Sequence, residues 1–420
     1  MRWLTDVLYL AVLLLTAPIW FTRMALRGRL RTDWAGRLGR APSLAPADGT
    51  RVLLHAVSVG EVNAIRTLVS LLEVQDGVEV VVATTTDTGF ARATSLFGDR
   101  HQVVRYPLDL SWSVARFLRS VKPDLVGLVE LEVWPNFVAS CVRRGIPVAV
   151  INGRLSERSF RRYRLVRAVL RPSFRRLTRA WVQTRDYAAR FEAMGVVPDR
   201  VDVVGSLKWD NTGVITGDPE GLAQAMGIDR TRLLVVAGST APEEHQLLHD
   251  GVGTGVQLMC APRRPEWFDD AAQVLQGCTR RSTGERGSNP DRYLLDTIGE
   301  LSQAYALADV VVVGRSFGSR HGSDVSEPAG LGKPVIIGPA SSDFEEMVVA
   351  LQDAGGLIQC SREELPGVLS DLLNDEQRRA RMASDGRGEI GRRQGASERT
   401  LAGLLDLVGL VGEGQRKSTR

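Results

Sequence analysis

Three acidic residues follow short apolar segments of this sequence, at points where a chain usually turns. Glu61 lies in HAVSVGEVNA, and Glu130 and Glu132 lie in LVELEVWPNF. A carboxylate held at the start of a helix can accept the proton of an attacking hydroxyl group, so we expect Glu61 to act as a general base. We expect Glu130 and Glu132 to project to one side of an extended segment, into a polar site. Alternatively, Glu61 is an ordinary acid in the first turn of a helix, and Glu130 and Glu132 are solvated acids at the edge of the sheet.

A second group of residues could bind a phosphate and a ribose. Arg263 and Arg264 follow an apolar segment in CAPRRPEWF, where arginine can hold a phosphate in a forked geometry. Residues 297–300 form a strand-to-helix turn with free N–H groups for an anion. Glu327, at another helix start, could hold ribose hydroxyls, and Lys208 could reach a leaving phosphate. Together these residues predict a nucleotide site in the second half of the chain, facing the acids of the first half.

Two repeating α/β patterns must position these residues. Residues 51–205 alternate apolar segments such as RVLLHA and VEVVVATTT with helical stretches, which is typical of a parallel sheet covered on both faces. The pattern restarts after the polar segment 211–220 with RLLVVAGS and GVQLMCAP. We therefore expect an α/β protein with two doubly wound, Rossmann-like domains facing a cleft, where the carboxyl ends of the strands meet.

The N-terminal segment differs in composition from the rest of the chain. Residues 7–22 carry no charge, and five arginines follow between positions 23 and 37. This pattern predicts an uncleaved membrane anchor with the bulk of the chain in the cytoplasm; a helix docked on the protein or lying in the interface is the alternative. The expected organisation is an anchor and basic flank at 1–30, a first domain at 31–210, a linker at 211–220, a second domain at 221–411 and a frayed tail at 412–420.

Charge and cysteine content narrow the possible partners. The 420 residues carry a net charge of +4, and the four cysteines form no CxxC pair, so we expect neither a zinc site nor a disulfide framework. Ten arginines lie between Arg154 and Arg179, beside an apolar stripe at helical spacing. A solvated face would explain them, but a membrane of anionic lipids or a phosphorylated lipid fits better, and no nucleic-acid-binding motif accompanies them.

The order of several motifs resembles one enzyme family. HAVSVGEV, TTTDTG, YPLDL, LVELEVWPN, NGRLSERS, VVGSLKWD, AGST, APRRPE, DTIGEL and SEPAGLGKPVIIGP run in the order found in the 3-deoxy-D-manno-octulosonic acid (Kdo) transferases. This resemblance extends from the N-terminal segment to about residue 345. It implies a GT-B fold and a metal-free, inverting glycosyltransferase that moves Kdo from CMP-Kdo to the lipid A precursor in lipopolysaccharide synthesis. It also implies attachment to the cytoplasmic face of the inner membrane, with no cofactor beyond the CMP-Kdo donor.

The resemblance also assigns roles to individual residues. Glu61 matches the family's general base, and Glu130 and Lys208 match its transition-state-stabilising acid and lysine. The positions that match the family's CMP-binding stretches are Pro262, Arg263, Ile298, Gly299, Glu300, Asp324, Val325, Ser326 and Glu327.

Two other functions stay open beside this one. The segment HGSDVSEP, residues 321–328, departs from the family pattern GGHNPLEP. A related GT-B transferase that uses another nucleotide sugar would explain this departure. Ala241 stands where the family usually has a histidine, which fits a binding protein that kept the fold and has weak or no activity.

Overall fold

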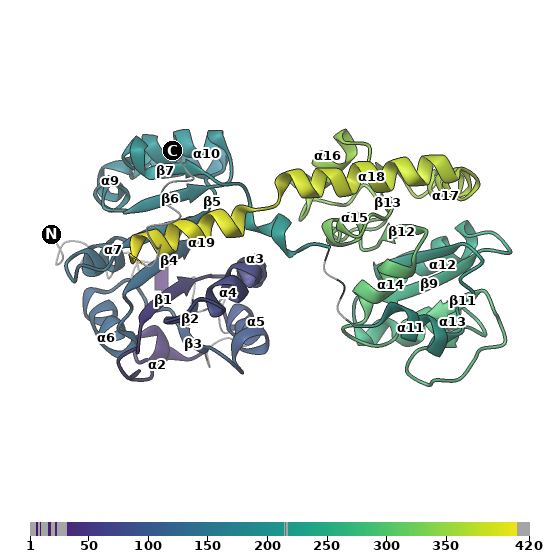
Figure 1. Cartoon of the computed structure of the whole chain (residues 1–420), viewed down its shortest axis with the longest axis horizontal. Coiled ribbons are helices and arrows are strands. Elements are labelled where there is room, and N and C mark those ends of the chain that lie inside the picture. Colours follow the sequence, from purple (N-terminus) through teal and green to yellow (C-terminus); the bar gives the residue numbers. More distant parts are fainter. Residues whose placement is uncertain are drawn as a thin grey trace. The chain divides into compact units, whose positions relative to one another are not determined.

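The computed structural model describes residues 6, 9, 16, 17, 22, 32–213, 215 and 217–409. These residues form two compact units, the first ending at Asp210 and resuming at Gln394, and the second spanning Asn211–Arg393 (Figure 1). The sequence placed residues 221–411 in the second domain, but the structure packs residues 394–409 with the first unit.

The first unit is built on a parallel sheet of seven strands with the order β3-β2-β1-β4-β5-β6-β7. The strands are β1 (Thr50–His55), β2 (Val78–Thr84), β3 (Gln102–Arg105), β4 (Leu125–Val129), β5 (Val148–Gly153), β6 (Arg179–Val182) and β7 (Val201–Val203). The strand order reverses between β1 and β4, so crossover helices lie on both faces of the sheet. Strands covered on both faces need apolar side chains throughout, which explains the continuous apolar segments of the sequence.

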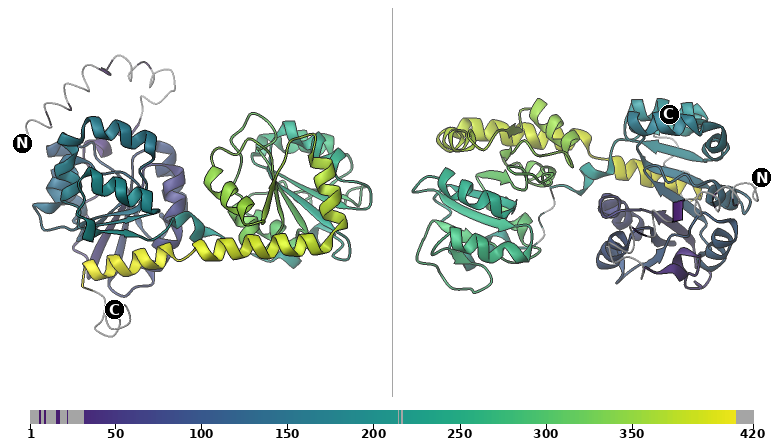
Figure 2. Two further views of the ribbon diagram at one scale, coloured as in Figure 1. Left: turned by 90° about the horizontal axis from the view of Figure 1, so that it is seen from above. Right: turned by 180° about the vertical axis from the view of Figure 1, so that it is seen from behind.

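Helices of the first unit cover this sheet from two sides (Figures 1 and 2). They are α2 (Trp34–Arg37), α3 (Val59–Ala64), α4 (Arg66–Glu73), α5 (Asp87–Phe97), α6 (Ser111–Val121), α7 (Pro135–Val142), α8 (Glu157–Leu165), α9 (Arg167–Arg175), α10 (Arg185–Met194) and α19 (Ala396–Leu407), with short 3₁₀ turns at Pro198–Arg200 and Leu207–Asn211. Alternate residues of one strand serve opposite faces: Leu53 belongs to the apolar cluster under α6 and α7, whereas Val52 and Leu54 belong to the cluster under α4 and α19.

The final helix of the described chain, α19, belongs to the first unit because of specific contacts at its start. The Asp210 carboxylate accepts hydrogen bonds from the backbone N–H groups of Gly395 at 2.7 Å and Ser397 at 2.6 Å, which caps the helix. The helix then packs closely over Trp181, since a Cβ atom on Gly403 would lie 2.2 Å from the indole ring. The two Asp210 hydrogen bonds alone link positions 185 and 187 residues apart, which no local sequence pattern reveals.

The second unit contains another parallel sheet of seven strands, with the order β10-β11-β9-β8-β12-β13-β14. The strands are β8 (Leu234–Thr240), β9 (Gln257–Pro262), β10 (Thr279–Arg280), β11 (Arg292–Leu294), β12 (Val310–Val313), β13 (Val335–Ile337) and β14 (Leu357–Gln359). The helices are α11 (Pro219–Met226), α12 (Pro242–Gly251), α13 (Phe268–Val274), α14 (Leu301–Leu307), α15 (Ser326–Gly330), α16 (Glu345–Asp353), α17 (Leu365–Asn374) and α18 (Glu376–Arg393), with a 3₁₀ turn at Pro265–Trp267. Here the strand order reverses between β8 and β12.

The fold class predicted from the sequence, two parallel-sheet Rossmann-like domains, is therefore confirmed. The cleft expected between the domains stays a prediction. Most of the expected membrane anchor, residues 1–30, lies outside the described residues, as does the tail from residue 410. Among the residues that are described, no helix has the length and apolar character needed to cross a membrane.

Candidate active site

Glu61 lies at the start of α3, directly beyond the carboxyl end of β1. Ser58 caps this helix, and its hydroxyl donates to Glu61 Oε1 at 2.9 Å, while the Val57 N–H donates to Oε2 at 2.9 Å. Burial raises the pKa of Glu61 above its ordinary value, and the negative charges of Glu130 and Glu132 add to that rise, although the two hydrogen bonds oppose it. The carboxylate is therefore oriented by its own turn and carries a proton affinity suited to a base.

Glu130 and Glu132 follow the carboxyl end of β4, the strand beside β1. The expectation that they project from an extended segment was wrong, because the strand ends at Val129 and Glu130 takes a left-handed backbone with φ of +58°. The turn is held by the Glu130 N–H, which donates to the Ile151 carbonyl at 3.0 Å. The charges of Glu130 and Glu132 nevertheless act on Glu61, so the three acids form one group. A strained glutamate at such a point is typical of a functional site.

A buried histidine holds the second of these acids. His55, the last residue of β1, is fully buried, and its ring stacks on Tyr106 with centroids 3.5 Å apart. Its Nδ1 lies 3.1 Å from the Ala83 carbonyl, and its Nε2 lies 3.5 Å from Glu132 Oε2. The Trp134 indole N–H donates to the same oxygen at 2.6 Å. Burial alone would raise the pKa of Glu132, but His55 and Trp134 together lower it, so Glu132 is held ionised beside Glu61.

Lys208 is positioned through an asparagine that the sequence analysis did not single out. Asn152, near the end of β5, is fully buried with φ of +53°, and its Oδ1 accepts the N–H of Leu207 at 3.0 Å. This bond anchors the 3₁₀ turn Leu207–Asn211, which carries Lys208. Within the part of the chain that the structure describes, the half-buried Lys208 ammonium has no hydrogen-bonding or ion-pair partner. The NGRLSERS motif contained the signal, because asparagine tolerates a left-handed backbone.

Several of these residues follow neighbouring strands near the point where the strand order of the first sheet reverses. Glu61 follows β1, Glu130 follows β4 and Asn152 lies near the end of β5, and these three strands are neighbours in the order of the sheet. In doubly wound sheets, ligands bind beyond the carboxyl ends of the strands at this reversal point. The arrangement supplies a base with raised proton affinity, a second acid and an accessible cation, which is suitable for proton removal from a hydroxyl group and for stabilising charge.

The second unit gathers another set of predicted residues around a buried tyrosine. Arg263 follows β9, and its N–H donates to the Thr240 carbonyl at 3.0 Å. Burial raises the pKa of the Tyr305 hydroxyl well above its ordinary value; the charges of Glu327 and Asp324 add to the rise, and that of Arg263 opposes it. Arg263, Asp324 and Glu327 therefore all act electrostatically on Tyr305, a residue that the sequence analysis missed.

The other predicted residues of the second unit have more local roles in the structure. Asp324 accepts the N–H of Ser326 at 2.9 Å and its hydroxyl at 2.6 Å, so this carboxylate is turned toward the start of α15. The Glu300 carboxylate pairs with Arg281 at 2.9 Å. Gly299 has φ of +98° and Ile298 is exposed, while Pro262 and Val325 are buried. Over the described ranges, no group of three or more His, Cys, Asp or Glu side chains is placed to hold a metal ion.

Comparison with known proteins identifies the family. A family model described as 3-deoxy-D-manno-octulosonic-acid transferase (kdotransferase) matches residues 32–211. A protein of Bordetella pertussis named 3-deoxy-D-manno-octulosonic acid transferase is 32% identical, with 93% of this chain and 96% of that protein covered. The chain belongs to the Kdo transferase family. A member from Haemophilus influenzae is 29% identical, with 95% of this chain and 97% of that protein covered.

Membership of the Kdo transferase family makes the chain a glycosyltransferase and confirms the resemblance found in its motifs. The solved structure of UDP-GlcNAc 2-epimerase from Neisseria meningitidis bound to UDP-GlcNAc has the same GT-B type of fold. It matches with a TM-score of 0.56 and 16% identity, over 85% of this chain and all of that one. At this level of identity the match bears on the fold alone. Glu61, Glu130 and Lys208 all lie within the segment that the family model matches.

Proposed function

We propose that this chain transfers Kdo from CMP-Kdo to a hydroxyl group of the lipid A precursor in lipopolysaccharide synthesis, with Glu61 as the general base. The observation that carries this proposal is the oriented carboxylate of Glu61, whose pKa is raised, at the reversal point of the first sheet of a chain that belongs to the Kdo transferase family. The match to the family extends through both units, which supports a shared donor and acceptor.

The reaction is a single displacement at the anomeric carbon of Kdo. The acceptor oxygen forms a bond to that carbon while the bond to the CMP phosphate oxygen breaks, so the configuration inverts. Glu61 takes the acceptor proton, and CMP leaves with the electron pair. Positive charge develops on the sugar ring in such a transition state, and the carboxylate of Glu130 stabilises it electrostatically. Lys208 and Arg263 supply positive charge for the leaving phosphate, and no cofactor or metal takes part.

Two surface features of the first unit support an acceptor held at an anionic membrane. Leu165 of α8, Val169 of α9 and Val166 between the two helices are exposed among the arginines noted above, and Leu165 is 87% exposed. Apolar side chains within a basic surface suit the boundary between lipid headgroups and acyl chains. This face supports a location at the cytoplasmic side of the inner membrane.

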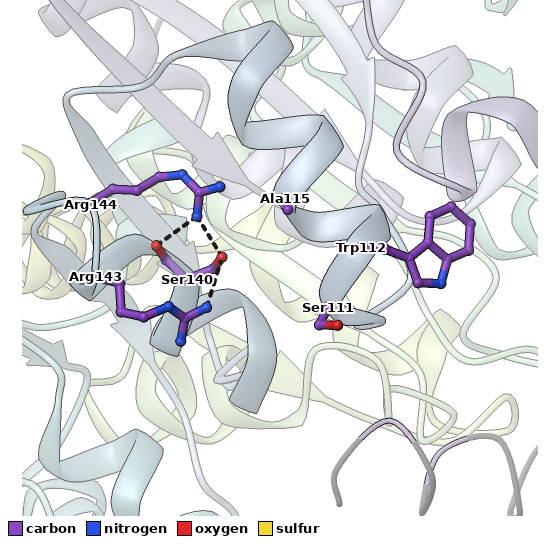
Figure 3. A pocket seen from close by; sticks show the side chains of 6 residues that line it. All are labelled: Ser111, Trp112, Ala115, Ser140, Arg143 and Arg144. Atoms are coloured by element: carbon purple, nitrogen blue, oxygen red, sulfur yellow. Dashed lines mark hydrogen bonds between the residues drawn. The ribbon is translucent and has the colours of Figure 1, made fainter. Parts of the chain in front are cut away.

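A hollow of about 430 Å³ between α6 and α7 adds to the basic surface of this unit. Its lining residues are Ser111, Trp112, Ala115, Ser140, Arg143 and Arg144 (Figure 3). The guanidinium groups of Arg143 and Arg144 both bind Ser140, and Trp112 is half exposed. This hollow is lined by none of the proposed catalytic residues, so we assign it to contact with lipid headgroups and not to the reaction itself.

The proposal is tested by incubating the purified full-length protein with CMP-Kdo and the tetraacylated disaccharide bisphosphate acceptor, and by mass spectrometry of the lipid. We expect Kdo-bearing lipid from the wild type, about 10²- to 10⁴-fold slower formation by Glu61→Gln, and a normal rate from the control Glu73→Gln. Glu73 is an acid of the same unit that pairs with Arg100 at the surface. No product from the wild type would reject the proposed reaction.

The alternative donor is distinguished by thermal stability. CMP should raise the melting temperature under the proposed function, whereas stabilisation by UDP- or GDP-linked sugars alone would favour a related transferase. Binding of CMP without any turnover would favour the relative with weak or no activity.

A further inference from the structure

The reversal point of the second sheet is occupied by an arginine that the predicted site does not include. Arg315 follows β12 after a single glycine, Gly314, and β12 is the neighbour of β8 across the reversal of strand order. Its backbone is left-handed, with φ of +59°. An L-residue other than glycine or asparagine is costly in this conformation. Arg315 therefore sits under strain at the position where doubly wound sheets bind their ligands.

The surrounding structure fixes the backbone of Arg315 tightly. The fully buried Glu244 carboxylate accepts the N–H of Arg315 at 2.8 Å, together with the N–H groups of Ala241, Ser316 and Phe317 at distances of 2.8–3.0 Å. On the other side, the Arg315 carbonyl accepts the N–H of Gly322 at 2.9 Å. The backbone from which the Arg315 side chain projects is therefore held on both sides.

Positive charge accumulates around this side chain. Burial lowers the pKa of Arg315, and the charges of Arg263, Arg320 and Arg264 lower it further, with Asp343 acting in the opposite direction. Arg320 and Arg264 both lie over the ring of Trp267, with guanidinium carbons 4.5 Å and 5.1 Å from the ring centroid. Guanidinium groups that lie close together repel one another, and a cluster of arginines is suited to binding an anion.

Two of these four arginines have acidic partners and two do not. Arg320 pairs with Glu243 at 2.8 Å, and Arg264 pairs with Glu266 at 3.3 Å. Among the side chains that the structure describes, the guanidinium groups of Arg263 and Arg315 make no ion pair and no hydrogen bond. Arg263 is exposed and Arg315 is half-buried. These two unneutralised cations follow β9 and β12, the two strands that flank β8.

We infer that Arg315 and Arg263 together form an anion site that binds an oxyanion of the donor, either the nucleotide phosphate or the carboxylate of the transferred sugar acid. This inference rests on the proposed function for the identity of the donor, but not for the existence of the anion site. The strain at Arg315 is retained because a glycine or asparagine there would lose the guanidinium that binds the anion.

The test uses Arg315→Asn, which tolerates the left-handed backbone and removes the charge, and Arg315→Lys, which keeps the charge. Lys122→Asn is the matched control, because Lys122 is an exposed cation with φ of +49° in the first unit. Each variant is made in the Glu61→Gln background to prevent turnover, and CMP, cytidine and CMP-Kdo are titrated by calorimetry. We expect Arg315→Asn to weaken binding of the relevant anion roughly 10- to 100-fold, as expected for the loss of hydrogen bonds to a charged group, and Arg315→Lys to weaken it less.

The pattern across ligands identifies the oxyanion. Equal losses for CMP and CMP-Kdo with unchanged cytidine binding assign Arg315 to the phosphate, and a loss for CMP-Kdo alone assigns it to the sugar carboxylate. Unchanged affinity for both, or an equal loss for cytidine, overturns the inference. Melting temperatures measured with inorganic phosphate test the anion site without relying on the identity of the donor. If the wild type binds neither CMP nor CMP-Kdo, the proposed function fails. The anion site is then supported if phosphate stabilises the wild type and Lys122→Asn but not Arg315→Asn. Equal stabilisation of the wild type and both variants by phosphate overturns the anion site.

Discussion

Replacement of Asn152 should reduce both stability and catalysis, because this residue ties the turn that carries Lys208 to the end of β5. Asn152→Gly removes the acceptor of the Leu207 N–H, and both residues are fully buried. An unpaired buried donor costs about 1–3 kcal/mol. Asn152→Ala adds the cost of a left-handed backbone at φ of +53°, about 1–2 kcal/mol. We therefore expect unfolding free energies lower by about 1–3 kcal/mol for the glycine variant and about 2–5 kcal/mol for the alanine variant.

Urea unfolding and melting temperatures measure the stability effect. For a unit of this size, 1 kcal/mol corresponds to about 2–4 °C, so Asn152→Gly should melt about 2–12 °C lower. Asn289→Gly is a control, since Asn289 accepts an N–H from Asp291 in a partly exposed turn of the second unit. A glycine variant less stable than the alanine variant would refute the role assigned to the left-handed backbone.

Catalysis tests whether Asn152 acts through Lys208. Loss of one electrostatic stabiliser usually lowers kcat by about 10²–10³, and we expect that range for Lys208→Ala. Asn152→Gly should lower kcat by about tenfold on its own, yet add no further loss in the Lys208→Ala background, because coupled residues are not additive. An equal loss in both backgrounds would refute the idea that Asn152 positions Lys208.

Three further predictions follow from the titration and hydrogen bonding of single residues. Burial raises the pKa of Glu61, and a base must be ionised, so kcat/KM should rise with pH above the ordinary glutamate range. Glu61→Gln should abolish this rising part of the pH–rate profile. A rise that persists in the variant would contradict the assignment of Glu61 as the base. Burial lowers the pKa of His245 from 6.5 to about 4, so the unfolded state binds more protons between those values. The unfolding free energy should then fall by up to about 3 kcal/mol as the pH drops from 6.5 to 4. Denaturant titrations of His245→Gln should show a shallower fall with pH. An equally steep fall in the variant would count against His245 as the source of this pH dependence. Glu244→Ala should destabilise the second unit by more than about 3 kcal/mol in urea unfolding, because four backbone N–H groups lose their acceptor. Glu244→Gln should cost less. Similar losses of stability in the two variants would show that water replaces the carboxylate.

The predictable part of the site lies in segments where local rules apply. Ser58 and Glu61 are a cap and a first-turn acid separated by three residues, so the start of α3 and the orientation of Glu61 follow from neighbouring residues alone. The apolar segments likewise predicted buried parallel strands, since only a sheet covered on both faces hides such segments. The extended geometry predicted at Glu130 failed because alternation along a strand applies only while the strand continues, and β4 ends one residue earlier.

The amino-acid sequence by itself determined the two α/β units, the family and the positions of the candidate acids and arginines, because these depend on periodicity and on motifs of neighbouring residues. Only the tertiary structure placed His55 beside Glu132, Asn152 against the backbone of Leu207, α19 on the first unit and Arg315 within the electrostatic influence of Arg263. The physical reason is that each of these contacts joins residues far apart in the chain. Their meeting depends on strand order and on backbone conformations that are stable only when the whole sheet has formed around them.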